Sequence, residues 1–202
     1  MTVRFSSGTW YLFDYGKVIS TEPEPADWAA LERETGLQLA PASSPYWAHR
    51  EAFDAGVASP AEYWARVLGR DSVDAEKVRT LEDLDAAQWA HLNPKTLRVL
   101  EALAGAGAQL ALLSNMPVRM SERYLRESSW PAYFTRTFFS GQLGLIKPDV
   151  RIFEHVLNEL AAAPGDVLFV DDNLPNIEAA RSLGLRTVHF GPETDLERQL
   201  AS

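Results

Sequence analysis

The 202-residue chain has no cysteine and only four histidines. The lack of cysteine excludes disulfides, thiolate nucleophiles and thiolate metal ligands. Basic residues are also in short supply, with 19 Lys and Arg against 28 Asp and Glu and a formal net charge of −9. Because this charge is repelled by a phosphate backbone and by an anionic membrane surface, we expect neither a nucleic-acid partner nor a membrane partner.

Long hydrophobic runs are missing as well. No apolar stretch approaches the roughly 20 residues that a membrane helix needs. The first residues, MTVRFSSGTWYLFDYG, lack the long apolar segment and small-residue cleavage site of a signal peptide. We therefore expect a soluble cytoplasmic protein. Hydrophobic residues still make up 46% of the chain, which is enough for a sizeable core.

Five short apolar runs, each bounded by turn residues, are predicted to be strands. They cover residues 10–13, 109–113, 137–139, 167–170 and 187–190. Their hydrophobicity is continuous rather than alternating, which is typical of strands that are buried on both faces of a parallel sheet. Segments with helical periodicity separate the last four runs. The pattern predicts an α/β fold, a Rossmann-like parallel sheet flanked by helices.

Residues 20–93 interrupt this alternation because they contain helical patterns and no convincing strand. The patterns are ADWAALERETG, PYWAHREAFDAG, SPAEYWARVLG and DAEKVRTLEDLDAAQWAHL. We predict a small α-helical cap domain over 20–93, inserted into an α/β core domain formed by 1–19 and 94–202. Trp47, His49 and Arg50, next to Tyr46, are candidate substrate-contacting residues of a lid. A charged helix face packed with aromatic residues would give the same pattern.

Polar residues follow the predicted strands where a ligand would bind. In an open α/β sheet, ligands lie outside the carboxyl ends of the strands. The first run ends at Asp14, the second at Ser114-Asn115 and the fourth at Asp171-Asp172, while Lys147 lies in a loop after the third. Carboxylates and ammonium groups are rarely buried unless they are paired or bind a metal. Their convergence at one sheet edge predicts a functional site.

The starts of three predicted helices support an anion site at this edge. SNMPVRM, KPDVRIF and DDNLPNIEAA each place a proline near a first helical turn, with Asn115 and Asn173 available as N-caps. Helix N-termini attract phosphate through their free N–H groups. With oxygen ligands, no cysteine and few histidines, the expected ion is Mg²⁺.

The ordered segments YLFDYGKVI, LALLSN, GLIKPD and DVLFVDDNLPNIEAARSLGL resemble the haloacid dehalogenase-like (HAD) hydrolases. The pattern is most similar to the branch with sugar-1-phosphatases and the N-terminal phosphatase domain of soluble epoxide hydrolase. The resemblance implies a helical C1-type cap and a nucleophilic Asp14 that forms an aspartyl-phosphate. It also implies Mg²⁺ held by Asp14, the backbone carbonyl of Gly16 and Asp172.

The resemblance assigns the remaining residues supporting roles. Ser114 and the backbone N–H of Asn115 would bind phosphoryl oxygens, and Lys147 would offset negative charge. Asp171 and Asn173 would lie behind the metal ligands, with Asp171 holding a metal-bound water or Lys147. The resemblance thus predicts a complete phosphate site apart from one position.

That position is Gly16, where most phosphatases of this superfamily have an aspartate that protonates the leaving group. We expect a Mg²⁺-dependent phosphatase, monomeric or homodimeric, acting on a small phosphorylated metabolite with an activated leaving group, a sugar phosphate being one candidate. Two alternatives stay open. One is a metal-independent 2-haloacid dehalogenase, and the other is a binding protein of this fold that has lost catalysis through Gly16.

Overall fold

The computed structural model describes residues 8–200 of the chain and contains one five-stranded sheet. All four strand pairings are parallel, and the order is β3-β2-β1-β4-β5. The strands are β1 (Trp10–Phe13), β2 (Gln109–Ser114), β3 (Arg136–Phe139), β4 (Val167–Asp171) and β5 (Arg186–His189). Each lies within one residue of its predicted bounds, so the predicted parallel α/β sheet is confirmed.

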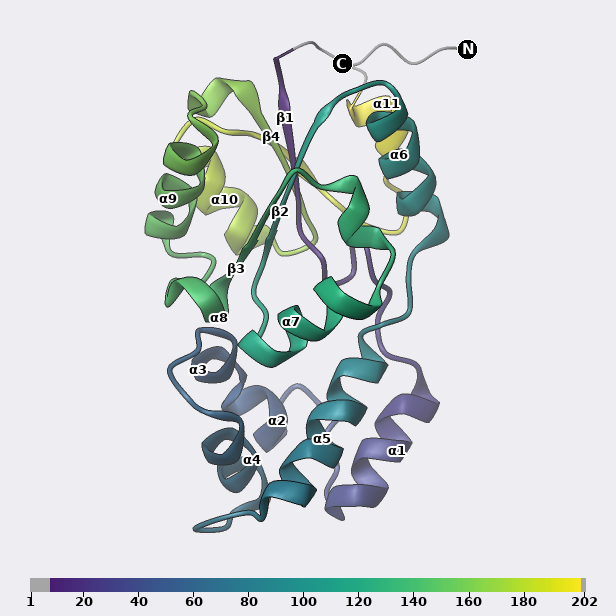
Figure 1. The fold of residues 1–202 in the computed structure, drawn as a ribbon, viewed down its shortest axis with the longest axis vertical. Coiled ribbons are helices and arrows are strands. Elements are labelled where there is room, and N and C mark those ends of the chain that lie inside the picture. The colour runs from purple at the N-terminus through teal and green to yellow at the C-terminus, as the bar shows by residue number, and fades with distance from the viewer. Residues whose placement is uncertain (1–7, 201–202) are drawn as a thin grey trace.

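Helices cover both faces of this sheet (Figure 1). One face packs against α6 (Pro94–Gly105), α7 (Val118–Glu127), η1 (Trp130–Tyr133) and α11 (Leu196–Leu200). The other packs against α9 (Val150–Leu160) and α10 (Leu174–Ser182), with the short α8 (Ser140–Leu143) and η2 (Pro164–Asp166) nearby. Because successive strand residues point to opposite faces, Leu12 enters one hydrophobic cluster and Phe13 the other.

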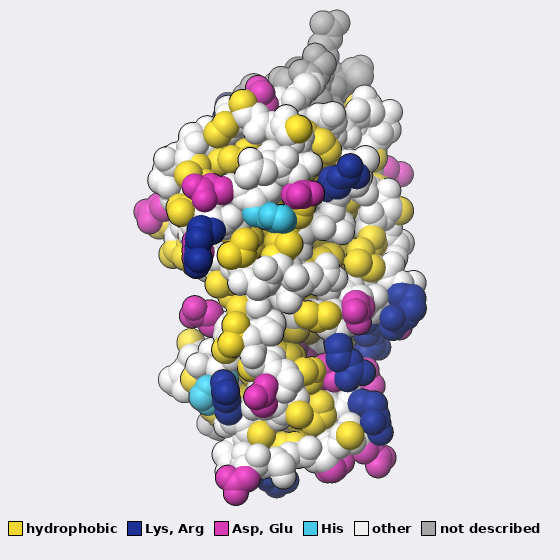
Figure 2. All heavy atoms as spheres, turned by 60° about the vertical axis from the view of Figure 1, so that its left-hand side comes forward, with side chains coloured by type: hydrophobic (Ala, Val, Ile, Leu, Met, Phe, Trp, Pro, Cys, Tyr) yellow, Lys and Arg dark blue, Asp and Glu magenta, His cyan; other side chains and the backbone are white. Residues whose placement is uncertain are grey.

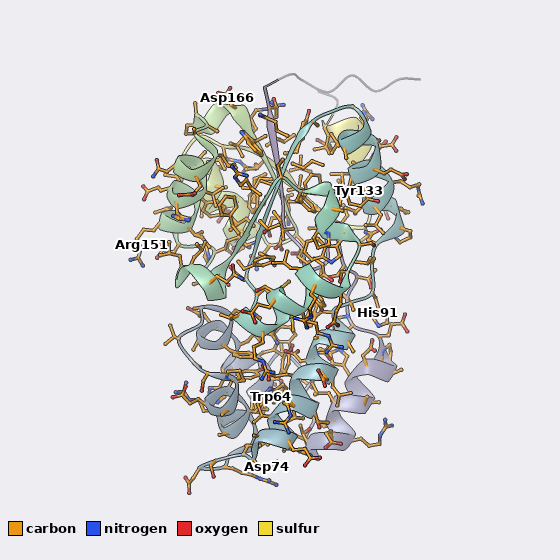
Figure 3. All side chains as sticks on the ribbon, in the orientation of Figure 1. Trp64, Asp74, His91, Tyr133, Arg151 and Asp166 are labelled. Carbon is orange, nitrogen blue, oxygen red and sulfur yellow. The ribbon has the colours of Figure 1, made fainter. Side chains whose placement is uncertain are left out.

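The segment between β1 and α6 is helical, as expected, and lies against one end of the core (Figure 1). It contains α1 (Pro25–Thr35), α2 (Pro45–Ala48), α3 (Arg50–Asp54), α4 (Pro60–Leu68) and α5 (Ala75–Gln88). The single helix predicted over 45–56 is broken at His49, and this break lets α2 pack on α4 while α3 reaches α8. These helices enclose a separate hydrophobic cluster around Trp64, which Figure 3 shows among them.

The chain enters and leaves this helical segment through two adjacent connections. Ser20 and Leu92 form an antiparallel bridge. The amide of Thr21 donates to the carbonyl of His91 at 2.7 Å, and the amide of Asn93 donates to that of Ile19 at 2.8 Å. The division into a core and a cap over 20–93 stays a prediction, and its proposed limits fall beside these bonds. We use the name cap for residues 20–93 below.

Within the described residues, no helix is both long and apolar enough to cross a bilayer.

Candidate active site

The carboxyl ends of β1, β2 and β4 meet at the edge of the sheet that faces the cap (Figure 1). The register pairs Phe13 with Leu112 on one side and with Val170 on the other. The residues that follow therefore lie side by side, and the amide of Asp14 donates to the carbonyl of Val170 at 2.9 Å. β1 and β4 flank the point where the strand order reverses, which is where open α/β sheets bind ligands.

Three carboxylates form a cluster at this point. Asp14, Asp171 and Asp172 each offer an oxygen, and these oxygens lie within 4.8 Å of one another. Asp14 and Asp171 are buried, while Asp172 is half-buried. Like charges this close repel strongly at low dielectric, so the cluster requires positive charge.

Lys147 supplies one positive charge. Its Nζ lies 2.8 Å from Oδ1 of Asp14 and 2.7 Å from Oδ2 of Asp171, and it also donates to the carbonyl of Leu113 at 3.0 Å. One ammonium between three carboxylates leaves an excess of negative charge. This donor set, hard oxygens with surplus negative charge, suits Mg²⁺.

The side-chain oxygens of Asp171 accept hydrogen bonds from other groups of the protein. Besides Lys147, it accepts from the amide of Asn173 at 2.7 Å and from Nδ2 of Asn176 at 3.1 and 3.0 Å. Asn176, on the first turn of α10, was not among the predicted site residues, and the structure adds it through these contacts to Asp171. The only sequence signal was its place on the turn that follows the two acids. Asp171 is thereby fixed as the group that holds Lys147.

Asn115 joins the end of β2 to the loop that carries Lys147. Its Nδ2 donates to the carbonyl of Lys147, and its Oδ1 accepts from the amide of the same residue, both at 2.9 Å. The expectation that Asn115 caps the next helix is wrong, because α7 begins at Val118 with Pro117 at the N-cap position. Asn173 does occupy the N-cap position of α10, but its side chain makes no capping bond.

Burial controls the electrostatics of the cluster. Burial is the largest cause that raises the pKa of Asp14, and together with the charge of Asp171 it brings this pKa to about 7, against the opposing effect of Lys147. Burial also raises the pKa of Asp172, with Asp171 adding to the effect and Lys17 opposing it. For Lys147 burial disfavours the charge, but Asp14 and Asp171 outweigh burial and raise its pKa. Lys147 is therefore a stable ammonium. A bound cation would help to ionise the neighbouring Asp14, the candidate nucleophile.

The cluster opens to solvent on the side of Asp172. Asp172 and Lys17 line a cleft of about 1210 Å³ between the start of α6 and the loop after β5. Lys17 has a φ of 57° and its Nζ pairs with Glu22 at 2.8 Å. The cleft therefore gives small molecules a route to Asp172, the outermost of the three carboxylates.

The three cap residues that were expected to contact substrate have different surroundings from one another. Arg50 is buried, and its guanidinium pairs with Asp54 at 2.7 Å and with Asp85 at 2.9 Å. Trp47 donates from its indole to the carbonyl of Ala40, and its ring packs on Tyr46 and Trp89. His49 is half-buried at the break between α2 and α3. For Arg50 the structure corrects the expectation, because two buried carboxylates already occupy its guanidinium.

Comparisons with known proteins agree on one family. The family model for haloacid dehalogenase-like hydrolases matches residues 13–184. An enzyme of the HAD family from Bacteroides thetaiotaomicron, solved in complex with magnesium and inorganic phosphate, has the same fold, with a TM-score of 0.73. It is 19% identical, and the match covers 94% of this chain and 98% of that chain.

Three curated relatives span different activities. Drimenol cyclase from Aspergillus calidoustus is 29% identical over 194 residues, which is 95% of this chain and 35% of the relative. A sesquiterpene phosphatase from Aspergillus oryzae is 33% identical over 93 residues, covering 46% and 47%. (S)-2-haloacid dehalogenase 4A from Burkholderia cepacia is 30% identical over 97 residues, covering 48% and 42%. The matches thus span about a third to a half of these relatives' lengths.

Proposed function

The chain belongs to the haloacid dehalogenase-like hydrolase family, and from this premise we propose that it is a Mg²⁺-dependent phosphatase acting on a small phosphorylated metabolite. The observation that carries the proposal is the Lys147 ammonium between Asp14 and Asp171, with the third carboxylate, Asp172, open to the cleft. Three carboxylates against one ammonium leave an excess of negative charge, which suits a cation that would in turn hold a phosphoryl group.

Asp14, Asp172 and the carbonyl of Gly16 are the groups that would hold the ion. When bound, Mg²⁺ neutralises charge on the carboxylates and on the phosphoryl oxygens. Asp171 stays behind this set because Lys147, Asn173 and Asn176 already use its oxygens. The polar side chains of the site are therefore divided between binding a cation and holding Lys147.

Asp14 carries the chemistry in this proposal. Its carboxylate attacks phosphorus, the bond to the leaving oxygen breaks, and an aspartyl-phosphate forms. Water then attacks the phosphorus, which releases inorganic phosphate and restores the carboxylate. Ser114 and the amide of Asn115 would bind the equatorial oxygens, and Lys147 would offset their charge.

The substrate class follows from Gly16. Without an acid two residues after Asp14, the leaving oxygen departs without a proton from that position. Leaving groups that need little protonation, such as anomeric sugar phosphates or acyl phosphates, suit this site. A sugar phosphate is one candidate, and the sesquiterpene phosphatase among the relatives extends the candidates to phosphorylated terpenoids.

The test is a panel of phosphoesters with Mg²⁺, comparing the native protein with Asp14→Asn. We expect phosphate release that needs both Mg²⁺ and Asp14, and a loss of at least about 10³-fold in Asp14→Asn, in line with removal of a nucleophile. Asp166→Asn is the matched control, because this exposed acid lies at the far end of the core from the cap (Figure 3).

Two results would contradict the proposal. Halide release from a 2-haloacid that persists in excess chelator would favour the dehalogenase alternative, which the relative from Burkholderia cepacia also represents. No phosphate release from any compound, with the protein folded, would favour a binding protein. The cluster of three carboxylates argues against the first, because a metal-free enzyme gains little from clustered acids, which repel one another.

A further inference from the structure

One of the contacts between the cap and the core is made by two glycines. Gly56, in the loop after α3, has a φ of 71°. A Cβ built on Gly56 would lie 3.2 Å from the Cα of Gly141 in α8 and still closer to its carbonyl oxygen. The two backbones are therefore in direct contact, with no room between them for even one methyl group.

Gly141 makes a second backbone contact on another side. A Cβ on Gly141 would lie 2.8 Å from the carbonyl oxygen of Met116 and 2.8 Å from the amide nitrogen of Val118. The amide of Gly141 donates to that same carbonyl of Met116 at 3.2 Å. Three backbone segments are thus packed against one another: the cap loop, the start of α8 and the turn after β2.

Ser140 bonds to two of these segments. It is fully buried, and its hydroxyl donates to the carbonyl of Asp54 in α3 at 2.5 Å. The same oxygen accepts from the amide of Met116 at 2.9 Å. One side chain therefore links the last residue of α3 to the residue directly after Asn115.

The turn held in this way leads to the reacting groups. Met116 follows Ser114 and Asn115, the residues proposed to bind phosphoryl oxygens. The Asn115 side chain makes two bonds to the backbone of Lys147, whose ammonium contacts Asp14. A displacement of the cap loop would reach the nucleophile through these contacts, each of which is a direct hydrogen bond or a packed backbone pair.

We infer that Gly56, Ser140 and Gly141 are positioning residues, through which the cap holds the Ser114–Met116 turn in its ligand-binding conformation. The part of this inference that concerns phosphate rests on the proposed function. Holding the turn fixes the Asn115 amide and the Ser114 hydroxyl relative to Asp14. A small displacement of these two groups would weaken ligand binding and lower the reaction rate substantially.

The test compares Gly56→Ala with Gly36→Ala in the full chain. Gly36 ends α1 at a φ of 74°, close to that of Gly56, but a Cβ there would meet no heavy atom within 4 Å. Both variants carry the same backbone strain, and only Gly56→Ala separates the cap loop from α8. The readouts are amide hydrogen exchange of Met116 and the Kd for inorganic phosphate with Mg²⁺, below the melting temperature of each variant.

For Gly56→Ala we expect exchange of the Met116 amide to rise at least about tenfold and phosphate to bind about tenfold more weakly. Gly36→Ala should match the native protein in both. Ser140→Ala removes the acceptor of the Met116 amide itself and so gives the reference rate of exchange for a broken link. Faster exchange confined to the cap, with Met116 unchanged in Gly56→Ala, would overturn the inference.

The experiment distinguishes failure of the proposed function from failure of the positioning role. If the native protein binds no phosphate but Met116 still responds to Gly56→Ala, the proposed function fails and the positioning role stands. If the native protein binds phosphate and Met116 does not respond, the positioning role fails alone.

Discussion

At the scale of single residues, Gly16 is the most informative position. A Cβ built there would meet no heavy atom within 4 Å, and its φ lies outside the left-handed region. Neither packing nor backbone conformation therefore requires glycine. The absence of a side chain two residues after Asp14 is therefore a chemical property of the site, and the structure has room there for a Cβ.

We predict that Gly16→Asp raises kcat/KM for phosphoesters with poor leaving groups by at least about tenfold, since general acid catalysis is worth about 10²–10⁴-fold. Activated substrates such as p-nitrophenyl phosphate should gain much less. The measurement is kcat/KM across leaving groups of increasing pKa. Gly16→Asn, of the same size but without an acid, is the control, and an equal gain in both variants would refute this account of the missing acid.

At the scale of elements, the contact between α3 and α5 contains an unbalanced charge cluster. Arg50 pairs with Asp54 and Asp85, and the hydroxyl of Tyr46 and Nε2 of Gln88 also bond to Asp85. Two carboxylates share one guanidinium. Burial raises the pKa of Asp54 to about 7, although Arg50 acts to lower it.

This raised pKa predicts a pH dependence of stability. Because the folded protein holds the Asp54 proton more tightly than the unfolded chain, whose value is 3.8, the free energy of unfolding should fall as pH rises from about 4 to 7. Asp54→Asn should flatten this decline and be more stable than the native protein at pH 8, since its amide oxygen can still accept from Nε of Arg50. Urea unfolding at pH 5 and pH 8 measures the difference. Equal slopes in the two proteins would contradict the prediction.

At the scale of the whole molecule, the carboxylate cluster couples metal binding to stability. The three acids repel one another in the folded protein, so an ion that binds only there stabilises the folded state by about 2.7 kcal/mol at a hundred times its Kd. We predict that Mg²⁺ raises the melting temperature and that a chelator reverses the rise. Asp172→Asn should lose most of the Mg²⁺ effect, which a thermal melt with and without the ion can measure.

Asp166→Asn controls for the loss of a negative charge, because Asp166 lies at the far end of the core (Figure 3). It should keep the full Mg²⁺ effect. A rise in melting temperature that survives Asp172→Asn undiminished would place the ion elsewhere. Weak binding of Mg²⁺ elsewhere on the surface should raise the melting temperature of all variants alike, and on the face drawn in Figure 2 acidic and basic side chains are interspersed.

Features of the core and the cap that depend on local sequence could be predicted, whereas features that depend on contacts between distant segments could not. The five strands were predictable because continuous apolar runs between turn residues are local signals. The convergence of Asp14, Lys147, Asp171 and Asp172 followed from one rule of parallel sheets, that the ends of strands meet at one edge. The break at His49 was not predictable, because it depends on where α3 meets α8.

Contacts between distant segments were decided only by the tertiary structure. The sequence by itself determined the sheet, the helical segment after the first strand and the carboxylates at the strand ends. It did not determine that Arg50 is neutralised inside the cap, that Asn115 bonds to the backbone of Lys147, or that Gly56 packs on Gly141. The physical reason is the distance along the chain over which each signal acts. Apolar periodicity is a property of a few neighbouring residues. A buried ion pair or a glycine contact instead depends on which distant segments the completed fold brings together.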